Sequence, residues 1–234
     1  HKDVCPANFI IDEGGRAARL IDFGLATGLE LKQTYVGNPE RIKGTLHYLS
    51  PEQTGRMNRV ADYRGDLYSL GATFYEMLSG RPPFTAKDAL ELVYAHIAQI
   101  PRPLREWRPE LPVVLARIVA RLLAKNAEDR YQSARGLKAD LARCLDAFQS
   151  TGELPEFSLG EHDFSGRFQL PQKLYGRADE TKALLQAYER CADGAVELVL
   201  VSGSSGTGKS ALVHEIHKPV TARRGYFISG KFDQ

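Results

Sequence analysis

The sequence predicts an α+β chain with a mainly helical first part, followed by the beginning of an α/β domain. Three patterns predict this fold class. A short hairpin pattern fills residues 9–21, and apolar residues recur at helical spacing in several segments between 66 and 148. A strand, a glycine-rich loop and a helix then follow one another from 196 to 216. With 234 residues, the chain is long enough for one large or two small domains.

Composition is that of an ordinary soluble protein, with 43% hydrophobic and 26% charged residues. The formal net charge of +2 is spread without a basic block, so we expect no nucleic-acid partner and no membrane partner for this segment. The longest apolar run near the end, 196–201, is far too short to cross a bilayer. Cys5, Cys144 and Cys191 are far apart and odd in number. They predict neither a disulfide framework nor a metal cluster, and they fit a reducing, cytoplasmic compartment.

The first element is a predicted hairpin. Residues 9–11 and 17–21 have the pattern of two short strands, and the Asp12-Glu13-Gly14-Gly15 run between them suits a tight turn. Pairing of these strands would bring Asn8, which precedes the first, close to Asp22, which follows the second.

The residues around this hairpin predict a phosphoryl-transfer site. The carboxylate of Asp22 and the amide oxygen of Asn8 are the hard oxygen ligands that Mg²⁺ prefers. Asp3, five residues before Asn8, is then free to accept a proton from an attacking hydroxyl, so we expect it to be the catalytic base. The alternative is that Asp3 and Asp22 are ordinary turn or capping residues.

Three triplets in this part of the chain resemble those of protein kinases. His1-Lys2-Asp3 is similar to H-R-D, Asp22-Phe23-Gly24 is D-F-G, and Ser50-Pro51-Glu52 stands where the family has A-P-E. Their order and spacing favour the kinase interpretation over turn or capping roles. The resemblance covers residues 1–149 and implies the C-terminal lobe of a kinase, with ATP and Mg²⁺ as cofactors and a protein as substrate.

The resemblance also implies roles for other residues. Residues 22–52 would be an activation segment, in which the Thr45 hydroxyl approaches the catalytic Asp. Within it, Thr34 is a more credible phosphorylation site than Thr45, although an ordinary solvated hydroxyl remains the better interpretation of Thr34. We expect Glu52 and Arg130 to form a buried ion pair that anchors this segment. Structural support would also come from Asp66, which accepts hydrogen bonds from the catalytic-loop backbone, and from His1 and Lys2.

Four helices are predicted after the activation segment. Residues 66–78 are apolar all round, which predicts a buried helix, and Ser79-Gly80-Arg81-Pro82-Pro83 is a strong stop signal. Residues 86–99 and 111–125 carry apolar residues at helical spacing. Residues 133–148 begin with a capping serine, and one stripe of this helix is formed by Leu137, Leu141, Leu145 and Phe148.

Two departures from the kinase pattern leave a second function open. Lys2 lacks the planar fork of the usual arginine, and Cys5 replaces the lysine that contacts the transferred phosphate in Ser/Thr kinases. The 234 residues also contain neither the kinase glycine-rich loop nor its strand lysine, and they start inside the catalytic loop without Met. We therefore expect a fragment that is inactive by itself. The alternative function is a pseudokinase or scaffold whose P-loop domain acts as a nucleotide-dependent signalling switch.

A second phosphate-binding motif follows residues 150–173, which have the composition of a linker. The motif matches G-x-x-x-x-G-K-[ST] and lies between a predicted strand at 196–202 and a predicted helix at 211–216. Its backbone N–H groups would surround the phosphates, the lysine would reach the outer phosphates, and the last serine would ligate Mg²⁺. The nucleotide-binding residues are Gly203, Ser204, Ser205, Gly206, Thr207, Gly208, Lys209 and Ser210. A Gly-rich surface turn is the alternative.

Residues 174–234 resemble the N-terminal part of AAA-type ATPases, in the 174–180 turn and in a strand-like run at 225–230. The whole chain is similar to bacterial hybrid signalling proteins that join a Ser/Thr kinase, an AAA-type ATPase, a GAF sensor and a histidine kinase. Residues 1–8, 44–59 and 225–234 carry that likeness. It implies phosphorylation of protein Ser/Thr hydroxyls, coupled to a second ATP-binding module, with ATP bound at two sites.

Overall fold

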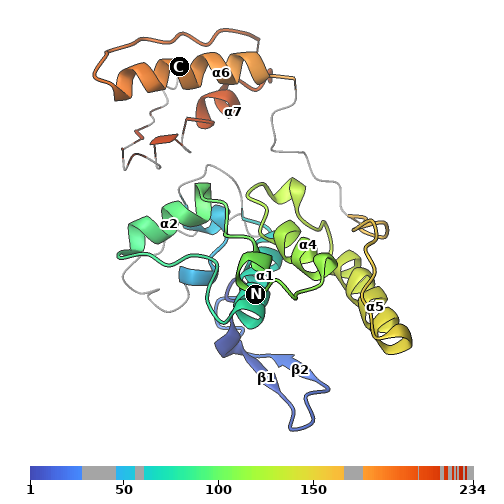
Figure 1. The fold of residues 1–234 in the computed structure, drawn as a ribbon. Coiled ribbons are helices and arrows are strands. Elements are labelled where there is room, and N and C mark those ends of the chain that lie inside the picture. Colours follow the sequence, from blue (N-terminus) through green and yellow to red (C-terminus); the bar gives the residue numbers. More distant parts are fainter. Residues whose placement is uncertain are drawn as a thin grey trace.

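The computed structural model describes residues 1–27, 46–55, 61–165, 176–204, 206–216, 219–220, 223, 225, 227–228 and 230 (Figure 1). Its elements are a short hairpin, a group of helices between residues 64 and 151, and two further helices near the C-terminus. None of the helices in these ranges combines the length and the apolar character that crossing a membrane would require.

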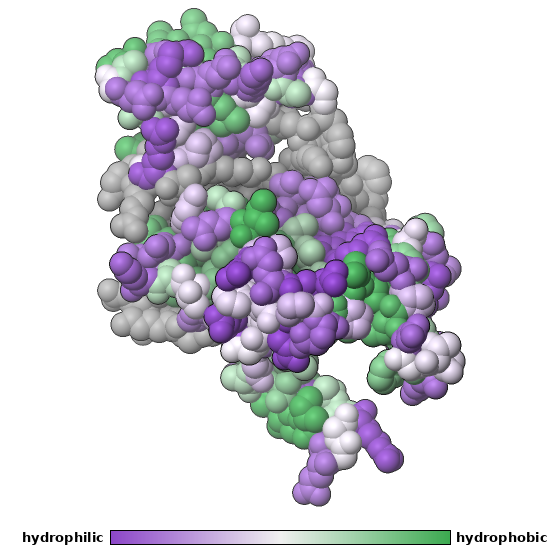
Figure 2. Space-filling model, in the orientation of Figure 1, coloured by the Kyte–Doolittle hydropathy of each residue, from purple (hydrophilic) through white to green (hydrophobic). Residues whose placement is uncertain are grey.

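The predicted hairpin is confirmed. Strands β1 (Phe9–Ile11) and β2 (Ala18–Leu20) pair antiparallel, with Phe9 opposite Leu20. The Asp12 carboxylate holds the turn, because it accepts hydrogen bonds from the backbone nitrogens of Arg16 (2.6 Å) and Ala17 (3.0 Å). The hairpin projects from the helices and presents apolar side chains to solvent, which Figure 2 shows as green surface at the bottom of the molecule.

Helix α1 (Arg64–Ser79) is the centre of the helical part, as its apolar pattern predicts. Tyr68 and Ala72 on it are fully buried, and Gly80 ends it in the left-handed conformation with φ +75°. Gly71 is where α1 crosses α4 (Val113–Leu122): a Cβ at Gly71 would lie 2.6 Å from the Cβ of Leu122. Only glycine permits this close crossing.

The other predicted helices form with slightly different ends. Residues 86–99 give α2 (Ala89–Ala98), capped by the Asp88 carboxylate, and residues 133–148 give α5 (Ala134–Thr151), capped by the Ser133 hydroxyl. A short helix, α3 (Leu104–Trp107), was not predicted. The predicted stripe of α5 is only partly buried: Leu137 is in the core, whereas the side chains of Leu145 and Phe148 are more than half exposed.

Residues 153–165, which we call the strap, pack against the helical part although they lie within the predicted linker. Leu154, Phe157 and Leu159 contact the hydrophobic core around α4 and α5. Asp163 fastens the end of the strap: its carboxylate accepts hydrogen bonds from the Gln132 backbone nitrogen (2.7 Å) and the Ser133 hydroxyl (3.0 Å). The strap is therefore part of the lobe's packing, and the aromatic at 157 is one of its anchors.

The C-terminal part contains α6 (Ala178–Ala192) and α7 (Lys209–His214). Helix α6 was not predicted, whereas α7 matches the expected helix after the glycine-rich loop. The strand predicted at 196–202 is not formed among the described residues, and Val196 and Leu198 are almost fully exposed. A strand needs a neighbour to pair with, and β1 and β2 are the only paired strands in the described ranges. The second predicted strand, 225–230, is described only in part.

Candidate functional site

Asp3 and Asn8 face one another across the loop that precedes the hairpin. The Asn8 amide nitrogen donates hydrogen bonds to the Asp3 backbone oxygen (2.8 Å) and to its carboxylate oxygen Oδ2 (3.0 Å). The other carboxylate oxygen of Asp3, Oδ1, is buried and has no hydrogen-bond partner in the described part of the chain. One oxygen of this carboxylate is thus fixed, and the other remains available as an acceptor.

His1 connects this loop to the segment after the hairpin. Its Nε2 lies 3.0 Å from the Ile21 backbone oxygen, and its Nδ1 accepts a hydrogen bond from the Asp3 backbone nitrogen (3.3 Å). Its ring also packs edge-on against Phe23, with 4.7 Å between the ring centroids. These contacts place His1 between Asp3 and the Asp22-Phe23-Gly24 triplet.

The backbone of Lys2 is held from two sides. Its nitrogen donates to Asp66 Oδ1 (2.7 Å), and the other carboxylate oxygen of Asp66 accepts from the His1 amino nitrogen (2.8 Å). The Lys2 carbonyl accepts a hydrogen bond from the Gln53 side chain (3.0 Å). The expected contact between Asp66 and the catalytic-loop backbone is confirmed. The Lys2 ammonium has no hydrogen bond or ion pair with any described residue, so only its backbone contributes to this support.

Asp22 directly follows the residue that pairs with Asn8. The Ile21 backbone nitrogen donates to the Asn8 carbonyl (2.9 Å), which extends the strand pairing by one residue beyond Phe9 and Leu20. Asp22 has φ +60° and Lys2 has φ +70°, and these are the two non-glycine residues with positive φ in the described ranges. Both belong to the candidate site, where strained backbone is common because the surrounding contacts impose it.

This donor set fits a Mg²⁺ ion. Because the Asn8 amide nitrogen is turned toward Asp3, its oxygen is directed away, and it accepts no hydrogen bond from a described residue. The Asp22 carboxylate is exposed and accepts one hydrogen bond, from the Gly24 backbone nitrogen (3.1 Å). An amide oxygen and a carboxylate with free lone pairs are suitable ligands for a hard cation.

Cys5 lies in the same loop, but it is buried. Its side chain is 6% exposed, and burial raises the pKa of its thiol, with the nearby Asp3 charge adding to the effect. The thiol is therefore neutral at physiological pH. It supplies none of the positive charge that a lysine would bring at this position.

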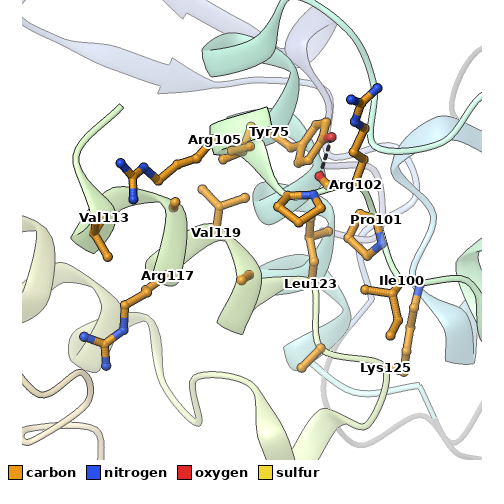
Figure 3. A pocket seen from close by; sticks show the side chains of 15 residues that line it. Tyr75, Ile100, Pro101, Arg102, Arg105, Val113, Arg117, Val119, Leu123 and Lys125 are labelled. Carbon is orange, nitrogen blue, oxygen red and sulfur yellow. Dashed lines mark hydrogen bonds between the residues drawn. The ribbon is translucent and has the colours of Figure 1, made fainter. Parts of the chain in front are cut away.

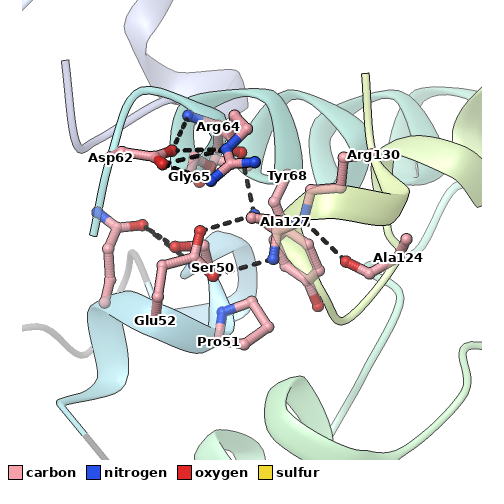
Figure 4. Close-up of polar contacts among 12 residues, drawn as sticks. Ser50, Pro51, Glu52, Asp62, Arg64, Gly65, Tyr68, Ala124, Ala127 and Arg130 are labelled. Atoms are coloured by element: carbon pink, nitrogen blue, oxygen red, sulfur yellow. Dashed lines mark hydrogen bonds and ion pairs between the residues drawn. The ribbon is translucent and has the colours of Figure 1, made fainter. Parts of the chain in front are cut away.

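Glu52 and Arg130 form the predicted buried ion pair (Figure 4). The Arg130 guanidinium donates to both carboxylate oxygens of Glu52, at 2.6 and 2.9 Å, and to the backbone oxygens of Ala124 and Arg64. Arg130 has no exposed surface, and its guanidinium carbon lies 4.9 Å from the centre of the Tyr68 ring. The pair joins residues 50–53 to α1 and to the loop before α5.

Gln53 is the site residue that the sequence analysis missed. Its side-chain oxygen accepts from the Ser50 backbone nitrogen (3.1 Å) and hydroxyl (2.8 Å), while its nitrogen holds the Lys2 carbonyl. The residues from Ser50 to Gln53 have the S-x-x-Q spacing of a capping box, and this signal could have identified the residue.

The glycine-rich loop is described except for Ser205. The Lys209 ammonium donates to the backbone oxygens of Gly203 (2.8 Å) and Ser204 (2.6 Å), and the Thr207 hydroxyl also donates to Ser204. Gly203, Gly206 and Gly208 all have positive φ, which glycine adopts without strain. The lysine ammonium thus lies at the mouth of the loop, bonded to the loop's own carbonyls, and Ser210 is exposed on the first turn of α7.

Other predicted residues lie outside the described ranges. Thr45, Thr34 and Ser205 are among them, as are the 56–59 run and most of 225–234. The structure joins Asp3 to Asn8 by hydrogen bonds, pairs Asn8 with the residue that precedes Asp22, and separately describes most of the glycine-rich loop.

Two family models match this chain. The model of the protein kinase domain matches residues 1–141, and the model of the AAA ATPase domain matches residues 173–234.

The similar proteins are named as kinases. The chain is 36% identical over 225 residues to hybrid signal transduction histidine kinase G of Dictyostelium discoideum, an alignment that covers 88% of this chain and 6% of that protein. It is 40% identical over 156 residues to serine/threonine-protein kinase PknB of Mycobacterium tuberculosis, covering 67% of this chain and 24% of that protein. For the probable serine/threonine-protein kinase PknB of Bifidobacterium longum the identity is 38% over 141 residues, covering 60% and 20%.

The chain spans about a quarter or less of the length of these relatives. Because the kinase model ends at residue 141, an alignment that covers 88% of the chain extends into the part matched by the ATPase model. The Dictyostelium protein is therefore similar to this chain on both sides of the strap.

Proposed function

Because this chain belongs to the protein kinase family, we propose that residues 1–149 form the C-terminal lobe of a serine/threonine kinase that phosphorylates a protein substrate with ATP. Residues 174–234 are proposed to begin an AAA-type ATPase module with its own ATP site, after a connection at 150–173. The observation that carries the kinase proposal is the state of Asp3: one carboxylate oxygen is fixed by Asn8, and the other is buried and unpaired.

The residues of the kinase half divide the work of phosphoryl transfer. The Asp3 carboxylate accepts the proton of the attacking Ser or Thr hydroxyl. Asn8 orients that carboxylate through its amide nitrogen and, with Asp22, offers oxygen ligands to Mg²⁺. A Mg²⁺ ion held by these two residues would supply positive charge to offset the negative charge that develops on the transferred phosphate. Hydrogen bonds hold the backbone of Lys2 and Asp3 in position, and their partners are the side chains of His1, Asp66 and Gln53.

The base Asp3 and the two oxygen ligands Asn8 and Asp22 are all present. For this reason we prefer phosphoryl transfer to a scaffold function. Because the Cys5 thiol is neutral, this position lacks the positive charge that a lysine would place near the transferred phosphate. The rate of phosphoryl transfer is therefore lower than in a kinase with lysine at this position.

The test is an Asp3→Asn change in the complete protein that contains this chain. The amide keeps the shape and the hydrogen bond from Asn8 but cannot accept a proton, so transfer of radiolabelled phosphate to a generic protein substrate should fall roughly 100-fold or more. Asp146→Asn, an exposed change on α5, is the matched control and should retain full activity. Near-normal transfer by Asp3→Asn would remove Asp3 as the base.

A further inference from the structure

A pocket of about 500 Å³ lies on the helical lobe (Figure 3), and its lining does not include Asp3, Asn8 or Asp22. We call it the α3–α4 pocket, because its walls are the 100–105 segment leading into α3 and the 113–120 face of α4. Tyr75 of α1 and residues 123–125 complete the lining. Its size is in the range of sites that bind small ligands or single side chains.

The wall at 100–105 is held in place by hydrogen bonds and stacking. The Tyr75 hydroxyl donates to the Arg102 backbone oxygen (2.7 Å) and accepts from the Trp107 indole nitrogen (2.9 Å). The Arg102 and Arg81 guanidinium carbons each lie 4.0 Å from the centre of the Trp107 ring. The pocket is therefore preformed, and a ligand would not need to order its walls.

The lining combines an apolar interior with positive charge. Four cationic residues line the pocket and no Asp or Glu does so among the described residues. In Figure 3, the Arg105 and Arg117 side chains flank one side of the pocket, with Val113 between them. Arg105 has no carboxylate partner in the described part of the chain; its guanidinium contacts the Pro109 backbone oxygen at 3.3 Å. A ligand for this pocket thus has an apolar part and at least one anionic group.

The strap shows what kind of chain binds to such arginines in this protein. On the neighbouring side of α4, Arg117 lies 3.6 Å from the Glu156 carboxylate and contacts the Phe157 backbone oxygen (3.4 Å). The Phe157 ring packs into the core and lies under the Arg143 guanidinium, 4.2 Å from its carbon. An extended segment with an acidic residue followed by an aromatic one is already docked here, through an arginine that also lines the pocket.

We propose that the α3–α4 pocket is a docking site for an acidic peptide segment of a partner protein. An apolar side chain of the segment enters the pocket, and a flanking carboxylate pairs with Arg105, the pocket arginine without a carboxylate partner among the described residues. Guanidinium groups suit this role because their planar fork binds carboxylates through two hydrogen bonds. The proposal goes beyond the kinase function and requires no phosphoryl transfer.

The test is fluorescence anisotropy with a fluorescein-labelled Glu-Glu-Leu-Phe-Glu-Glu peptide and the 234-residue chain. Saturable binding is expected, and it should weaken at high salt because surface charges are screened. A peptide with Gln in place of every Glu and a peptide with Ser-Ser in place of Leu-Phe should each bind more weakly, since each lacks one of the two required features.

Chain variants locate the binding. Arg105→Glu reverses the unpaired charge, and Ala120→Trp fills the pocket from an exposed position on α4. Each change should weaken peptide binding about 10-fold or more. For Arg105→Glu this is the loss expected for one charge-assisted contact. Arg135→Glu, an exposed arginine of α5 outside the pocket, and Ala120→Ser, which leaves the pocket open, are the matched controls. Thermal unfolding of every variant checks that it is folded.

Three results would overturn the proposal. One is the absence of saturable binding at up to about 1 mM peptide. Another is an equal loss with Arg135→Glu, which would mean non-specific charge attraction. The third is binding of dodecanoate with the same dependence on Arg105 and Ala120 while the peptide shows none, which would assign the pocket to a fatty acid. If Ala120→Trp does not fold, Arg105→Glu still decides, and the outcome is independent of the Asp3→Asn assay.

Discussion

Glu52 and Arg130 are 78 positions apart in the sequence and are joined by two hydrogen bonds in the interior of the lobe. Among the described residues, the Glu52 carboxylate is the one anion that accepts hydrogen bonds from the Arg130 guanidinium. The other acceptors of this guanidinium are backbone oxygens. The position of residues 50–53, which hold the Lys2 backbone through Gln53, therefore depends on this ion pair.

Glu52→Gln should destabilise the lobe strongly, because it keeps the shape of the side chain but leaves a buried guanidinium without a counter-charge. The cost of breaking such a pair is about 3 to 5 kcal/mol in the free energy of unfolding. Urea unfolding of the kinase lobe, followed by circular dichroism, measures it. Glu106→Gln breaks the exposed pair with Arg102 and should give no measurable change. Equal midpoints for the two variants would show that the buried pair does not stabilise the lobe.

The His96 side chain should remain neutral at pH values far below the usual pKa of histidine. Its side chain is 1% exposed, and its Nδ1 lies 3.0 Å from the Tyr68 hydroxyl. Burial, reinforced by the nearby Lys125 charge, lowers the pKa of His96 from 6.5 to about 3. The NMR signal of its Cε1–H group should keep the neutral chemical shift from pH 7 to about pH 4.5, and a His96→Gln sample identifies the signal. In urea the same group should titrate near 6.5.

The sign of the stability effect follows from these two values. Between about pH 6.5 and pH 3 the unfolded chain binds a proton at His96 and the folded chain does not. The contribution of His96 to the unfolding free energy is thus complete above pH 6.5. It is lost as the pH falls, by at most about 1.4 kcal/mol per pH unit. A folded-state titration midpoint near 6.5 would contradict this account.

Lys209→Ala should weaken nucleotide binding at the glycine-rich loop. One charge-assisted contact to the outer phosphates is lost, worth about 1.5 to 3 kcal/mol or roughly 10- to 100-fold in affinity. Backbone N–H groups remain, so some binding should survive. Titration of the chain with a fluorescent ATP analogue and Mg²⁺ measures the change, and Lys182→Ala on the exposed face of α6 is the control. Equal affinities for all three chains would mean that the loop does not bind phosphate here.

Asp163→Ala should release the strap. The Asp163 side chain is 1% exposed, and the change leaves the Gln132 nitrogen and the Arg121 guanidinium without their carboxylate partner. Limited digestion with chymotrypsin reports the release. Phe164 is 76% exposed and should be cut at the same rate in both chains, whereas Phe157 is packed and should be cut faster in the variant. Unchanged cleavage after Phe157 would show that Asp163 does not fasten the strap.

Gly136→Ala tests the same contact from the opposite side. Alanine is ordinarily favoured over glycine inside a helix by about 1 kcal/mol. Here its Cβ would lie 2.5 Å from the Asp163 Cβ and 2.6 Å from the Asp163 Cα, so the strap would have to move. We expect a lower thermal midpoint and faster cleavage after Phe157. A higher midpoint, as helix propensity alone predicts, would argue against tight packing at this position.

The hairpin, the four main helices and the Glu52–Arg130 pair could be predicted because their signals are local or come from a family motif. Alternating and helical periodicity set the elements, and Asp88 and Ser133 mark two helix starts by capping chemistry. The spacing of Asp3, Asn8 and Asp22 around the hairpin predicts that they surround one point.

The missed features depend on contacts between segments distant in the sequence. Residues 153–165 have the composition of a linker, and only the fit of Asp163 against Gly136 and Gln132 shows that they are packed. The strand expected at 196–202 has the right pattern, but pairing depends on a neighbour that the pattern does not contain. The α3–α4 pocket likewise arises from the packing of Tyr75 and Trp107 against the 100–105 segment.

Because Asp163 is attached to the lobe, the length of chain that follows it limits how far apart the two modules can lie. About 15 residues separate Asp163 from the start of α6 at Ala178, and a chain of that length spans at most about 50 Å when fully extended. Because a short connection confines the two modules to a small volume, the effective concentration of each module around the other is of millimolar order. A contact between the two modules that has only millimolar affinity as separate proteins would therefore be occupied for much of the time within one polypeptide. Nucleotide turnover in one module could then influence the other without a large or strongly hydrophobic interface.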